Sequence, residues 1–289
     1  MRKKVLVTGK SGQLGQSINK IAADYPNLDF TFVGRDELDL SQASSIERFF
    51  NNKSFDAIIN CAAYTAVDKA ETETELANQI NHLAVGQLAA VAKQQNAYFI
   101  HLSTDYVFDG TNSKPYQETD TTNPINVYGL TKLKGEQAIR AIKPKGAIIR
   151  TAWVYSEFGN NFVKTMLKLG KERASLNVIA DQVGTPTYAT DLAKTIITLL
   201  LSSADNEAQL KTYHYANDGV CSWYDFAKTI FELANITCQV NPIETKDYPT
   251  PAKRPHYSVL NKAKIKQDLG LGSSYWKDSL KTCITTLIM

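Results

Sequence analysis

The 289-residue sequence lacks the features that mark several specialised protein classes. No apolar run approaches the ~18 residues expected of a membrane-spanning helix, and Met1-Arg-Lys-Lys leads into a strand-like run without the apolar region of a signal peptide. The four cysteines show no C-x-x-C spacing and the four histidines no metal-ligand pattern, which disfavours disulfides and a zinc site. We therefore expect a cytoplasmic protein with no bound metal.

The sequence also lacks a strong charge of either sign, internal repeats and low-complexity tracts. Its formal net charge is +3, from 32 basic and 29 acidic residues, which argues against a dedicated nucleic-acid surface and is compatible with an anionic small-molecule ligand. The hydrophobic content of 43% is ordinary for a globular protein. We expect no nucleic-acid or membrane partner, and a chain of this length can form one large domain or two smaller ones.

A glycine-rich loop follows the first predicted strand. Val5–Thr8 is a short apolar, β-branched run, Gly9-Lys-Ser-Gly12-Gln-Leu-Gly15 follows it, and Gln16–Ala23 has helix-forming composition. A strand, a glycine turn and a helix in this order are the context of a dinucleotide site, where the backbone approaches the pyrophosphate and the helix N-terminus presents free N–H groups. The spacing is G-x-x-G-x-x-G, and the alternative is a generic strand-to-helix turn.

The second predicted strand, Phe30–Val33, ends at Gly34-Arg35-Asp36. An acidic residue near this point usually binds the adenosine ribose hydroxyls, whereas an arginine accommodates a 2′-phosphate. The pattern favours NADPH, with NADH also usable, and the alternative for Arg35 is a solvated surface charge. Further along, Ser44-Ser-Ile-Glu47 has the pattern of a capping box that would begin a helix through Phe50.

Three more apolar runs alternate with helical patterns. Asp56–Asn60, Tyr98–Leu102 and Ala147–Thr151 read as strands, and Leu76–Gln95 has apolar residues at helical spacing. This alternation predicts an α/β fold with a doubly wound, parallel, Rossmann-type sheet that binds ligands at the carboxyl ends of its strands. The rule brings one set of positions into a single crevice: Gly9–Gly15, Ala62, Thr104, Tyr128 and Trp153.

The second half of the chain is less regular. We predict helices at 161–169 and 191–201, a strand at 211–217 that could return to the main sheet, and a helix capped by Ser222. The segment Pro242–Pro255 is proline-bearing and predicted to contain no helix. We expect residues 1–155, with a returning segment at about 186–218, to form the NAD(P)-binding domain. Residues 156–185 and 219–289 would form a smaller α/β substrate-binding domain.

Catalytic chemistry is predicted where the Tyr98–Leu102 strand ends. Thr104 follows this strand, and Tyr128 and Lys132 lie four residues apart on a predicted helix, so that they share one face. A tyrosine with a pKa near ~10 is a slow acid at neutral pH, and a nearby ammonium would lower that pKa. Tyr128 would then donate a proton to a carbonyl that Thr104 orients. The alternative is that Tyr128 and Lys132 are ordinary residues of a helix face.

The motifs TGKSGQLG, STDYVFDG, YGLTK, GTPTYATDLA and KRPHYSVL resemble the extended short-chain dehydrogenase/reductase family, and within it the branch of dTDP-4-dehydrorhamnose reductases. The resemblance covers nearly the whole chain. It implies that a dTDP-linked 4-keto-6-deoxy sugar is reduced at C4 by NAD(P)H, from dTDP-6-deoxy-L-lyxo-4-hexulose to dTDP-L-rhamnose. It makes Tyr128 the proton donor, Lys132 its modulator and Thr104 the carbonyl-orienting hydroxyl, and it adds substrate contacts from Asp105, Trp153 and Arg254.

The same resemblance implies which residues line the cofactor site. They are Gly12, Gln13, Leu14, Asp39, Leu40, Ala62, Ala63 and Thr65, to which the glycine loop and the second strand end add Gly9, Ser11, Gly15 and Arg35, and the predicted catalytic helix adds Tyr128 and Lys132. Some family members bind magnesium between glutamates at a dimer contact, but the corresponding place beside the glycine loop is not acidic here (Gly15, Gln16). We therefore predict no metal and leave monomer and homodimer as alternatives.

Two other functions remain open at this point. The chain could be another extended-family nucleotide-sugar enzyme, an epimerase or a dehydratase. It could also be a non-catalytic, reductase-like regulatory subunit of methionine adenosyltransferase. Related dehydratases carry an acidic residue directly after Thr-Asp, where this chain has Tyr106, which favours reduction without elimination. The presence of Thr104, Tyr128 and Lys132 together disfavours the regulatory role.

Overall fold

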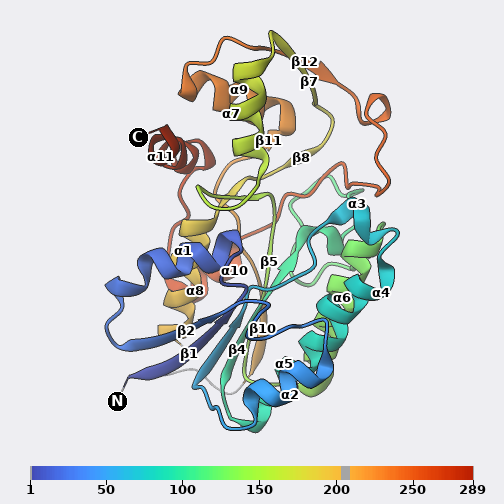
Figure 1. Cartoon of the computed structure of the whole chain (residues 1–289). Coiled ribbons are helices and arrows are strands. Elements are labelled where there is room, and N and C mark those ends of the chain that lie inside the picture. The colour runs from blue at the N-terminus through green and yellow to red at the C-terminus, as the bar shows by residue number, and fades with distance from the viewer. Residues whose placement is uncertain (1, 203–208, 289) are drawn as a thin grey trace.

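A computed structural model describes residues 2–202 and 209–288 and shows an α/β fold built on one parallel sheet (Figure 1). The six strands lie in the order β10-β5-β4-β3-β1-β2. Their bounds are β1 (Lys3–Thr8), β2 (Leu28–Val33), β3 (Ala57–Asn60), β4 (Tyr98–Thr104), β5 (Gly146–Thr151) and β10 (Leu210–His214). The strand order reverses between β1 and β3. Open parallel sheets bind ligands at such a reversal point. The predicted doubly wound sheet is confirmed.

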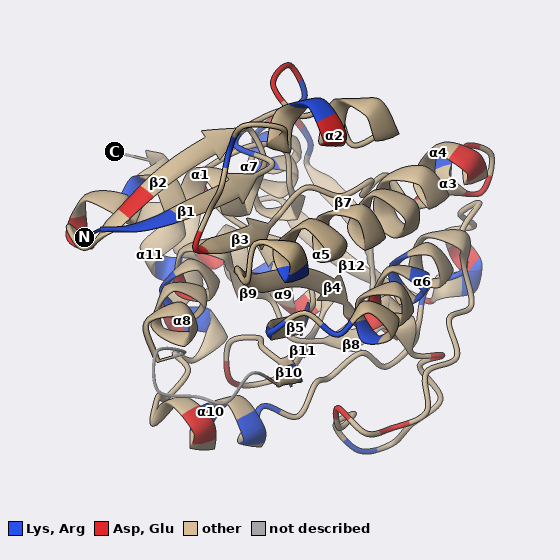
Figure 2. Ribbon diagram, turned by 90° about the horizontal axis from the view of Figure 1, so that it is seen from below, with Lys and Arg blue, Asp and Glu red and all other residues tan. Residues whose placement is uncertain are grey.

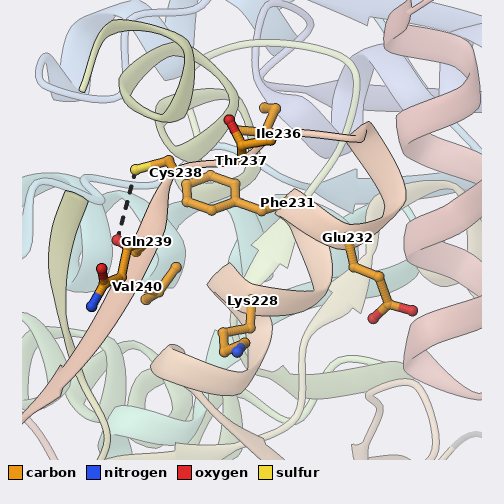
Figure 3. A pocket seen from close by; sticks show the side chains of 8 residues that line it. All are labelled: Lys228, Phe231, Glu232, Ile236, Thr237, Cys238, Gln239 and Val240. Atoms are coloured by element: carbon orange, nitrogen blue, oxygen red, sulfur yellow. Dashed lines mark hydrogen bonds between the residues drawn. The ribbon is translucent and has the colours of Figure 1, made fainter. Parts of the chain in front are cut away.

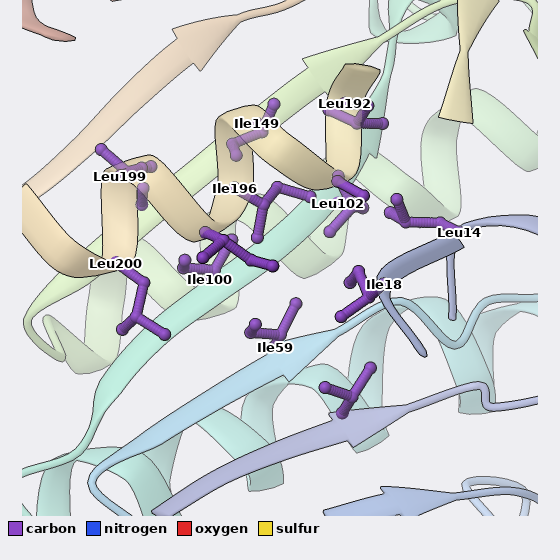
Figure 4. Packing of buried hydrophobic residues seen from close by; sticks show 14 of the residues in the cluster. Leu14, Ile18, Ile59, Ile100, Leu102, Ile149, Leu192, Ile196, Leu199 and Leu200 are labelled. Atoms are coloured by element: carbon purple, nitrogen blue, oxygen red, sulfur yellow. The ribbon is translucent and has the colours of Figure 1, made fainter. Parts of the chain in front are cut away.

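One face of the sheet is covered by α1 (Gln13–Ile21), α8 (Ala189–Ser202) and α10 (Ala263–Leu269). Ile18 of α1 and Ile196 of α8 point toward Ile59 and Ile100, which project from neighbouring strands (Figure 4). These side chains are fully buried. Burial of this apolar surface is the main force that holds the two helices on the sheet.

The opposite face is covered by α2 (Ala43–Phe50), α5 (Ala84–Gln94) and α6 (Val127–Ile142), as the view from below shows (Figure 2). Alternate residues of the same strands face this second layer, among them Leu6, Ile58 and Phe99. Because both faces are buried, the strands are apolar nearly throughout, which is why they were recognisable in the sequence. Basic and acidic positions are interspersed on the ribbon in Figure 2.

The predicted helix Leu76–Gln95 is interrupted by one π-helical turn. It comprises α4 (Thr74–Asn78), the π-turn η2 (Gln79–Leu83) and α5, and the short helix α3 (Val67–Ala70) precedes it. The side chain of Asn81 is fully buried in the π-turn and bonds the backbone of Tyr64 and the hydroxyl of Thr131. Single π-turns are often found at functional sites, and this one fixes α6 against the loop after β3.

The structure corrects one helix start and confirms another. Helix α2 begins at Ala43 and its N-cap residue is Gln42, so the predicted capping box Ser44–Glu47 is wrong. The hydroxyl of Ser45 accepts a hydrogen bond from the Asp39 N–H, which joins α2 to the preceding loop. Ser222 does cap a helix, α9 (Trp223–Ala234), through a capping box with Asp225.

The remaining elements surround a separate apolar cluster that includes Val163, Phe226 and Leu280. They are β6 (Val154–Tyr155), α7 (Phe162–Glu172), β7 (Ser175–Ile179), β8 (Val183–Gly184), β9 (Thr187–Tyr188), β11 (Cys221–Ser222), α9, β12 (Gln239–Ile243) and α11 (Trp276–Ile288). Pro242 lies in β12, which pairs only with β7 and so can lack one N–H donor. A 3₁₀ turn, η4 (Thr245–Asp247), follows it, so the prediction of no helix among these prolines is wrong.

We propose the domain division predicted from the sequence, with one refinement. Strand β10 pairs in parallel with β5, so the segment at about 186–218 does return to the main sheet, although its residues 203–208 lie outside the described part of the chain. Ile265 of α10 packs into the core formed with α1 and α8. Helix α10 therefore belongs with the sheet domain rather than with the rest of 219–289. No helix within residues 2–202 and 209–288 has both the length and the hydropathy to cross a bilayer.

Candidate active site

The carboxyl ends of the central strands meet at one edge of the sheet. Backbone register pairs Thr8 of β1 with Asn60 of β3, Asn60 with His101 of β4, and Thr104 of β4 with Thr151 of β5. The loops that follow these strands therefore start side by side. This register brings the predicted cofactor loop, the Ala62 region and Thr104 to the same edge, as the strand pattern predicted.

The glycine loop is built for close backbone contact. Gly9 has φ +73°, and a Cβ atom there would lie 2.9 Å from the Ala62 nitrogen. A Cβ on Gly15 would lie 2.2 Å from the Gly9 carbonyl oxygen. Gly12 precedes α1 with no side-chain cap, and no acidic residue lies in the first turn of α1. The N–H groups of that turn are therefore suited to a phosphate.

The side chains of the loop have other partners. The Gln13 amide donates to the carbonyl of Val154 at 3.2 Å and accepts from Ser156 and Asn161, so it links α1 to the chain after β5. Leu14 is buried in the sheet core. The Ser11 carbonyl accepts from the Gln16 side chain. The side chains of Gln13 and Leu14 are thus occupied within the protein, so these two residues would contact a cofactor mainly through their backbone.

The residues predicted to bind the adenosine end of the cofactor follow β2. The Arg35 side chain is 76% exposed, and its Nε lies 3.5 Å from an Asp39 carboxylate oxygen. Asp39 also accepts hydrogen bonds from the backbone and hydroxyl of Ser41. Leu40 is buried in the second core, so its side chain has a packing role. An exposed guanidinium in a weak surface ion pair is free to bind a 2′-phosphate.

The loop after β3 passes close to the glycine loop. The N–H of Ala62 donates to the Thr8 hydroxyl at 3.2 Å, and Ala63 is half-buried beside it. Thr65 is exposed. Cys61 lies on the inner side of this loop, where burial raises the pKa of its thiol far above the usual range, so it is not a reactive thiolate.

Thr104 and Asp105 lie at the end of β4 and are almost completely buried. The Thr104 hydroxyl donates to Asp105 Oδ1 at 2.9 Å and accepts from the Tyr106 N–H at 3.2 Å. Asp105 Oδ2 is buried and makes no hydrogen bond of normal geometry among the described residues, although the Ser258 hydroxyl lies near enough to lower the pKa of the carboxyl. Burial raises the pKa of Asp105 to about 7. An unpartnered buried carboxylate oxygen is a ready acceptor for a ligand hydroxyl.

Tyr128 lies in the first turn of α6, which Asn126 caps by accepting from the Gly129 N–H at 2.7 Å. Its half-buried ring packs edge-on against Tyr106, with centroids 5.7 Å apart. Burial raises the pKa of Tyr128 to about 12, the Thr104 hydroxyl lowers it, and the Asp105 charge raises it again. The structure thus places the Tyr128 phenol beside Thr104 and Asp105 and keeps it protonated at neutral pH.

Lys132, one turn further along α6, is buried and directed at β4. Its ammonium donates to the Leu102 carbonyl at 2.5 Å and lies 3.4 Å from Nε2 of His101. Burial lowers the pKa of Lys132 to about 8. The prediction that Lys132 lowers the pKa of Tyr128 is wrong in this arrangement, because burial dominates the Tyr128 phenol and the ammonium binds to the strand.

Trp153 follows β5 in a conformation that is rare for a large residue, with φ +49°. Its indole stacks on Trp223 with centroids 3.6 Å apart, and Gly184 passes so close that a Cβ atom there would lie 2.7 Å from the indole. Trp153 is half-buried at the junction between the sheet and the smaller domain. Strained backbone of this kind is concentrated at functional sites.

Arg254 is not free in the structure. Its guanidinium donates to both carboxylate oxygens of Asp68, at 3.0 and 2.7 Å, and to the hydroxyl of Thr250. This bond holds the pKa of the Asp68 carboxyl below its usual range. Asp68 lies on α3, so the ion pair connects the C-terminal KRPHYSVL segment to the loop after β3. A substrate that binds Arg254 would have to share or replace Asp68.

Several polar residues beneath the site were missed in the sequence. Glu136 and Arg150 form a buried ion pair with bonds of 2.8 and 2.9 Å, and Ser103 donates to the same carboxylate at 2.6 Å. Asn60 and His101 are fully buried and bonded to each other. A polar residue inside an otherwise apolar strand run was the available signal, because such residues need buried partners.

A separate surface pocket lies between the end of α9 and β12 (Figure 3). Its lining combines Phe231, Ile236 and Val240 with Lys228 and Glu232. The residues predicted to form the catalytic and cofactor sites are not among those that line it. Within the described residues, no group of histidine, cysteine, aspartate or glutamate side chains has the geometry to hold a metal ion.

Comparison with known proteins identifies relatives over the whole chain. Residues 2–289 match the model of the RmlD substrate binding domain. A dTDP-4-dehydrorhamnose reductase of Aggregatibacter actinomycetemcomitans is 42% identical over 286 residues, which cover 96% of this chain and 97% of that protein.

Two solved structures have the same fold with full coverage. The dTDP-4-dehydrorhamnose reductase of Clostridium acetobutylicum superposes with a TM-score of 0.92 at 43% identity and covers 99% of this chain and 100% of its own. That of Bacillus anthracis, solved in complex with NADP, gives a TM-score of 0.93 at 37% identity with the same coverage. The chain therefore belongs to the RmlD family, the family of these dTDP-4-dehydrorhamnose reductases.

Proposed function

We propose that the protein reduces the C4 ketone of dTDP-6-deoxy-L-lyxo-4-hexulose to dTDP-L-rhamnose with NADPH, a step in the synthesis of cell-surface polysaccharide precursors. The observation that carries the proposal is the placement of a protonated Tyr128 beside Thr104 and Asp105 at the sheet edge that also holds the glycine loop. Membership of the reductase family supports the same activity.

The residues present fit a dinucleotide. The glycine loop has no room for side chains at Gly9 and Gly15, and α1 begins without a cap or an acidic residue, so its N–H groups suit a pyrophosphate. Arg35 is exposed after β2 and is proposed to bind the 2′-phosphate of NADPH, with NADH as a poorer substitute. When bound, the nicotinamide supplies the hydride for carbonyl reduction.

The protein's own residues would supply orientation and a proton. Tyr128 keeps its phenolic proton throughout the neutral range because burial raises its pKa to about 12, so it is proposed to protonate the developing alkoxide. Thr104 is proposed to orient the carbonyl, which requires its hydroxyl to turn away from Asp105 Oδ1. Lys132 is proposed to hold the nicotinamide ribose.

The substrate is proposed to lie between the sheet edge and the smaller domain. Asp105 Oδ2 would accept from a sugar hydroxyl, and the Trp153 indole would cover the sugar. Arg254 would bind the diphosphate in place of Asp68. We propose that the protein acts in the cytoplasm as a monomer or homodimer, without a metal, nucleic-acid or membrane partner.

Purified protein incubated with dTDP-6-deoxy-L-lyxo-4-hexulose and NADPH should consume the cofactor in step with formation of dTDP-L-rhamnose, followed by absorbance and by chromatography. Failure to oxidise NADPH with this substrate would reject the proposed reaction. Isomerisation without net NADPH loss would indicate an epimerase instead. Omission of divalent metal and addition of a chelator should leave the rate unchanged.

A further inference from the structure

Three buried polar side chains form a row across the central sheet. The register pairs Thr8 of β1 with Asn60 of β3, and Asn60 with His101 of β4. Residues two positions earlier on the same strands, Leu6 and Ile58, face the core under α5 and α6. Because side chains of a strand alternate between faces, the row points to the same side, toward α6 and Lys132. Each member of the row is at most 2% exposed.

The row is a continuous chain of hydrogen bonds. The Ala62 N–H donates to Thr8 Oγ1 at 3.2 Å, and the Thr8 hydroxyl donates to Asn60 Oδ1 at 2.7 Å. Asn60 Nδ2 lies 3.0 Å from Nδ1 of His101. On the other side of the ring, His101 Nε2 lies 3.4 Å from Lys132 Nζ. The chain thus runs from the cofactor loops to the catalytic lysine.

The donors and acceptors of this chain determine the tautomer of His101. Asn60 uses its oxygen for Thr8, so it presents an N–H group to Nδ1, which must be an acceptor. Burial, together with the Lys132 charge, holds the pKa of His101 well below its usual range, so the ring is neutral. A neutral ring that accepts at Nδ1 carries its proton at Nε2. His101 therefore presents an N–H donor to Lys132.

This donor acts directly on the lysine nitrogen. An ammonium has three donors and no acceptor, whereas a neutral amine has a lone pair that can accept from Nε2–H. The other groups facing Lys132 are the Leu102 carbonyl, the Cys61 thiol, and Glu136 on its own helix, whose carboxylate is already bound to Arg150 and Ser103. Tyr128 lies one turn earlier on α6. Among these groups, the imidazole offers Lys132 an N–H donor across the helix–sheet boundary, and the Cys61 S–H is a much weaker donor.

We infer that His101 is a positioning residue for Lys132: Thr8 and Asn60 hold it in the Nε2–H tautomer, and in that form it orients the lysine nitrogen and weakens its hold on its third proton. The inference rests on the proposed role of Lys132 in the reductase. Its effect is to make Lys132 able to exchange a proton near neutral pH, which a solvated lysine with a pKa near ~10.4 does not do.

The first test reads the tautomer directly in the purified protein without turnover. The chain has four histidines, so ¹⁵N-histidine labelling gives four imidazole spin systems, and His101→Gln identifies the one from His101. We expect a neutral Nε2–H ring from pH 5 to 9. Thr8→Val should free the Asn60 amide to turn and convert His101 to the Nδ1–H form, whereas Thr8→Ser should leave it unchanged. An Nδ1–H or protonated ring in the wild type would overturn the inference.

The second test separates the two sides of the imidazole. The Gln side chain of His101→Gln is long enough to present an amide N–H to Lys132. The shorter side chain of His101→Asn can replace only the acceptor that faces Asn60. If His101 acts on Lys132, the alkaline limb of the kcat/KM profile should move up by roughly one pH unit in His101→Asn and Thr8→Val, a tenfold gain in proton affinity. It should stay in place in His101→Gln and Thr8→Ser.

If the alkaline limb of the kcat/KM profile lies at the same pH in His101→Asn and His101→Gln, His101 has only a structural role and the inference is rejected. Thermal unfolding checks that each variant is folded, and Thr8→Val carries the test with an intact ring if His101→Asn does not fold. Because the NMR measurement needs no substrate, failure of the proposed reduction and failure of this inference give different results.

Discussion

The hydroxyl of Thr104 donates a hydrogen bond of 2.9 Å to Oδ1 of Asp105, while the second oxygen of that carboxylate is buried and makes no hydrogen bond of normal geometry among the described residues. The Asp105 side chain is only 3% exposed, and burial raises its pKa to about 7. An ionised carboxylate in this place lowers the stability of the fold. Such a cost is typical of residues retained for a site rather than for folding.

Asp105→Asn should stabilise the protein at pH 8. The unfolded side chain has a pKa near ~3.9, and the folded one about 7. Between these values the unfolded state loses its proton first, so the free energy of unfolding falls as pH rises from about 4 to 7 and stays low above 7. The asparagine of the variant does not ionise. We therefore expect its free energy of unfolding to exceed that of the wild type by roughly 1–3 kcal/mol at pH 8, and the difference to disappear near pH 4. Urea unfolding at both pH values measures it.

Asp109 provides a control of opposite sign. The backbone N–H of Thr111 is the main reason that the pKa of Asp109 is lowered to about 2. Its contribution to stability is present above the unfolded pKa and lost as pH falls through the folded one. Asp109→Asn should therefore destabilise the protein at pH 8. If Asp105→Asn destabilises the protein at pH 8 as Asp109→Asn does, the assignment of Asp105 as a destabilising buried carboxylate is wrong.

Glu136→Gln should destabilise the protein strongly. The Glu136 carboxylate is fully buried and binds Arg150 through bonds of 2.8 and 2.9 Å, and loss of its charge leaves a buried guanidinium uncompensated. Breaking such a pair costs roughly 3–5 kcal/mol. Because Glu136 lies on α6 with Tyr128 and Lys132, kcat should also fall. Chemical unfolding of the single variant and of the Glu136→Met/Arg150→Met double variant, which should recover much of the loss, measures the effect.

The exposed ion pair between Lys277 and Glu232, at 3.2 Å, serves as the comparison. Its side chains are 41% and 65% exposed, so solvent screens the attraction. Glu232→Gln should change the free energy of unfolding by less than about 1 kcal/mol. A loss as large as that of Glu136→Gln would mean that charge removal itself, rather than burial, decides the outcome.

The parts of the site that the sequence predicted are those encoded locally. The glycine loop, Thr104 and the Tyr128–Lys132 pair each depend on a strand end or on one helical turn, and apolar runs buried on both faces identify the strands. The return of β10 to the sheet was also anticipated, as a possibility, from the predicted strand at 211–217.

What the sequence did not predict depends on register and burial. The Thr8–Asn60–His101 row exists only because three strands align at these positions, and one residue of slippage would turn each side chain to the other face. The capping box failed because α2 begins at Ala43, which places Ser44 inside the first helical turn and leaves Gln42 as the N-cap residue. The pKa of Tyr128 was predicted in the wrong direction because burial outweighs a lysine whose ammonium binds β4.

Gly15→Ala should weaken cofactor binding with little change in the sheet. The added Cβ atom would lie 2.2 Å from the Gly9 carbonyl oxygen, and because that contact is with backbone, the glycine loop itself must move. A displacement of this loop alters the N–H groups proposed for the pyrophosphate. We expect the Kd for NADPH to rise more than about tenfold, measured by fluorescence titration.

Gly272→Ala is the matched control for this change. Apart from its chain neighbours, no described residue has an atom within 4 Å of a Cβ atom at Gly272, and this residue has no positive φ. The substitution should leave NADPH affinity and stability near the wild type. Equal affinities for NADPH in Gly15→Ala and the wild type would show that the glycine loop does not bind the pyrophosphate.

Tyr128→Phe tests the proposed proton donor itself. The ring should remain packed edge-on against Tyr106, so the change removes only the phenolic hydroxyl. We expect kcat to fall by at least roughly a hundredfold, the usual contribution of a general acid, while NADPH affinity is retained. Because burial holds the pKa of Tyr128 at about 12, the phenol is protonated over the whole neutral range, and the loss should be the same at pH 6 and pH 9.

Tyr106→Phe distinguishes the role of Tyr128 from that of the neighbouring phenol. Its ring centroid lies 5.7 Å from that of Tyr128, but its hydroxyl has no assigned proton to transfer. This variant should lose far less activity than Tyr128→Phe under the same conditions. Comparable losses would mean that the two phenols act together, and near-normal turnover by Tyr128→Phe would place the proton donor elsewhere in the site. A loss in Tyr128→Phe that grew steadily with pH would instead mean that the wild-type phenol ionises in the neutral range, against the effect of its burial.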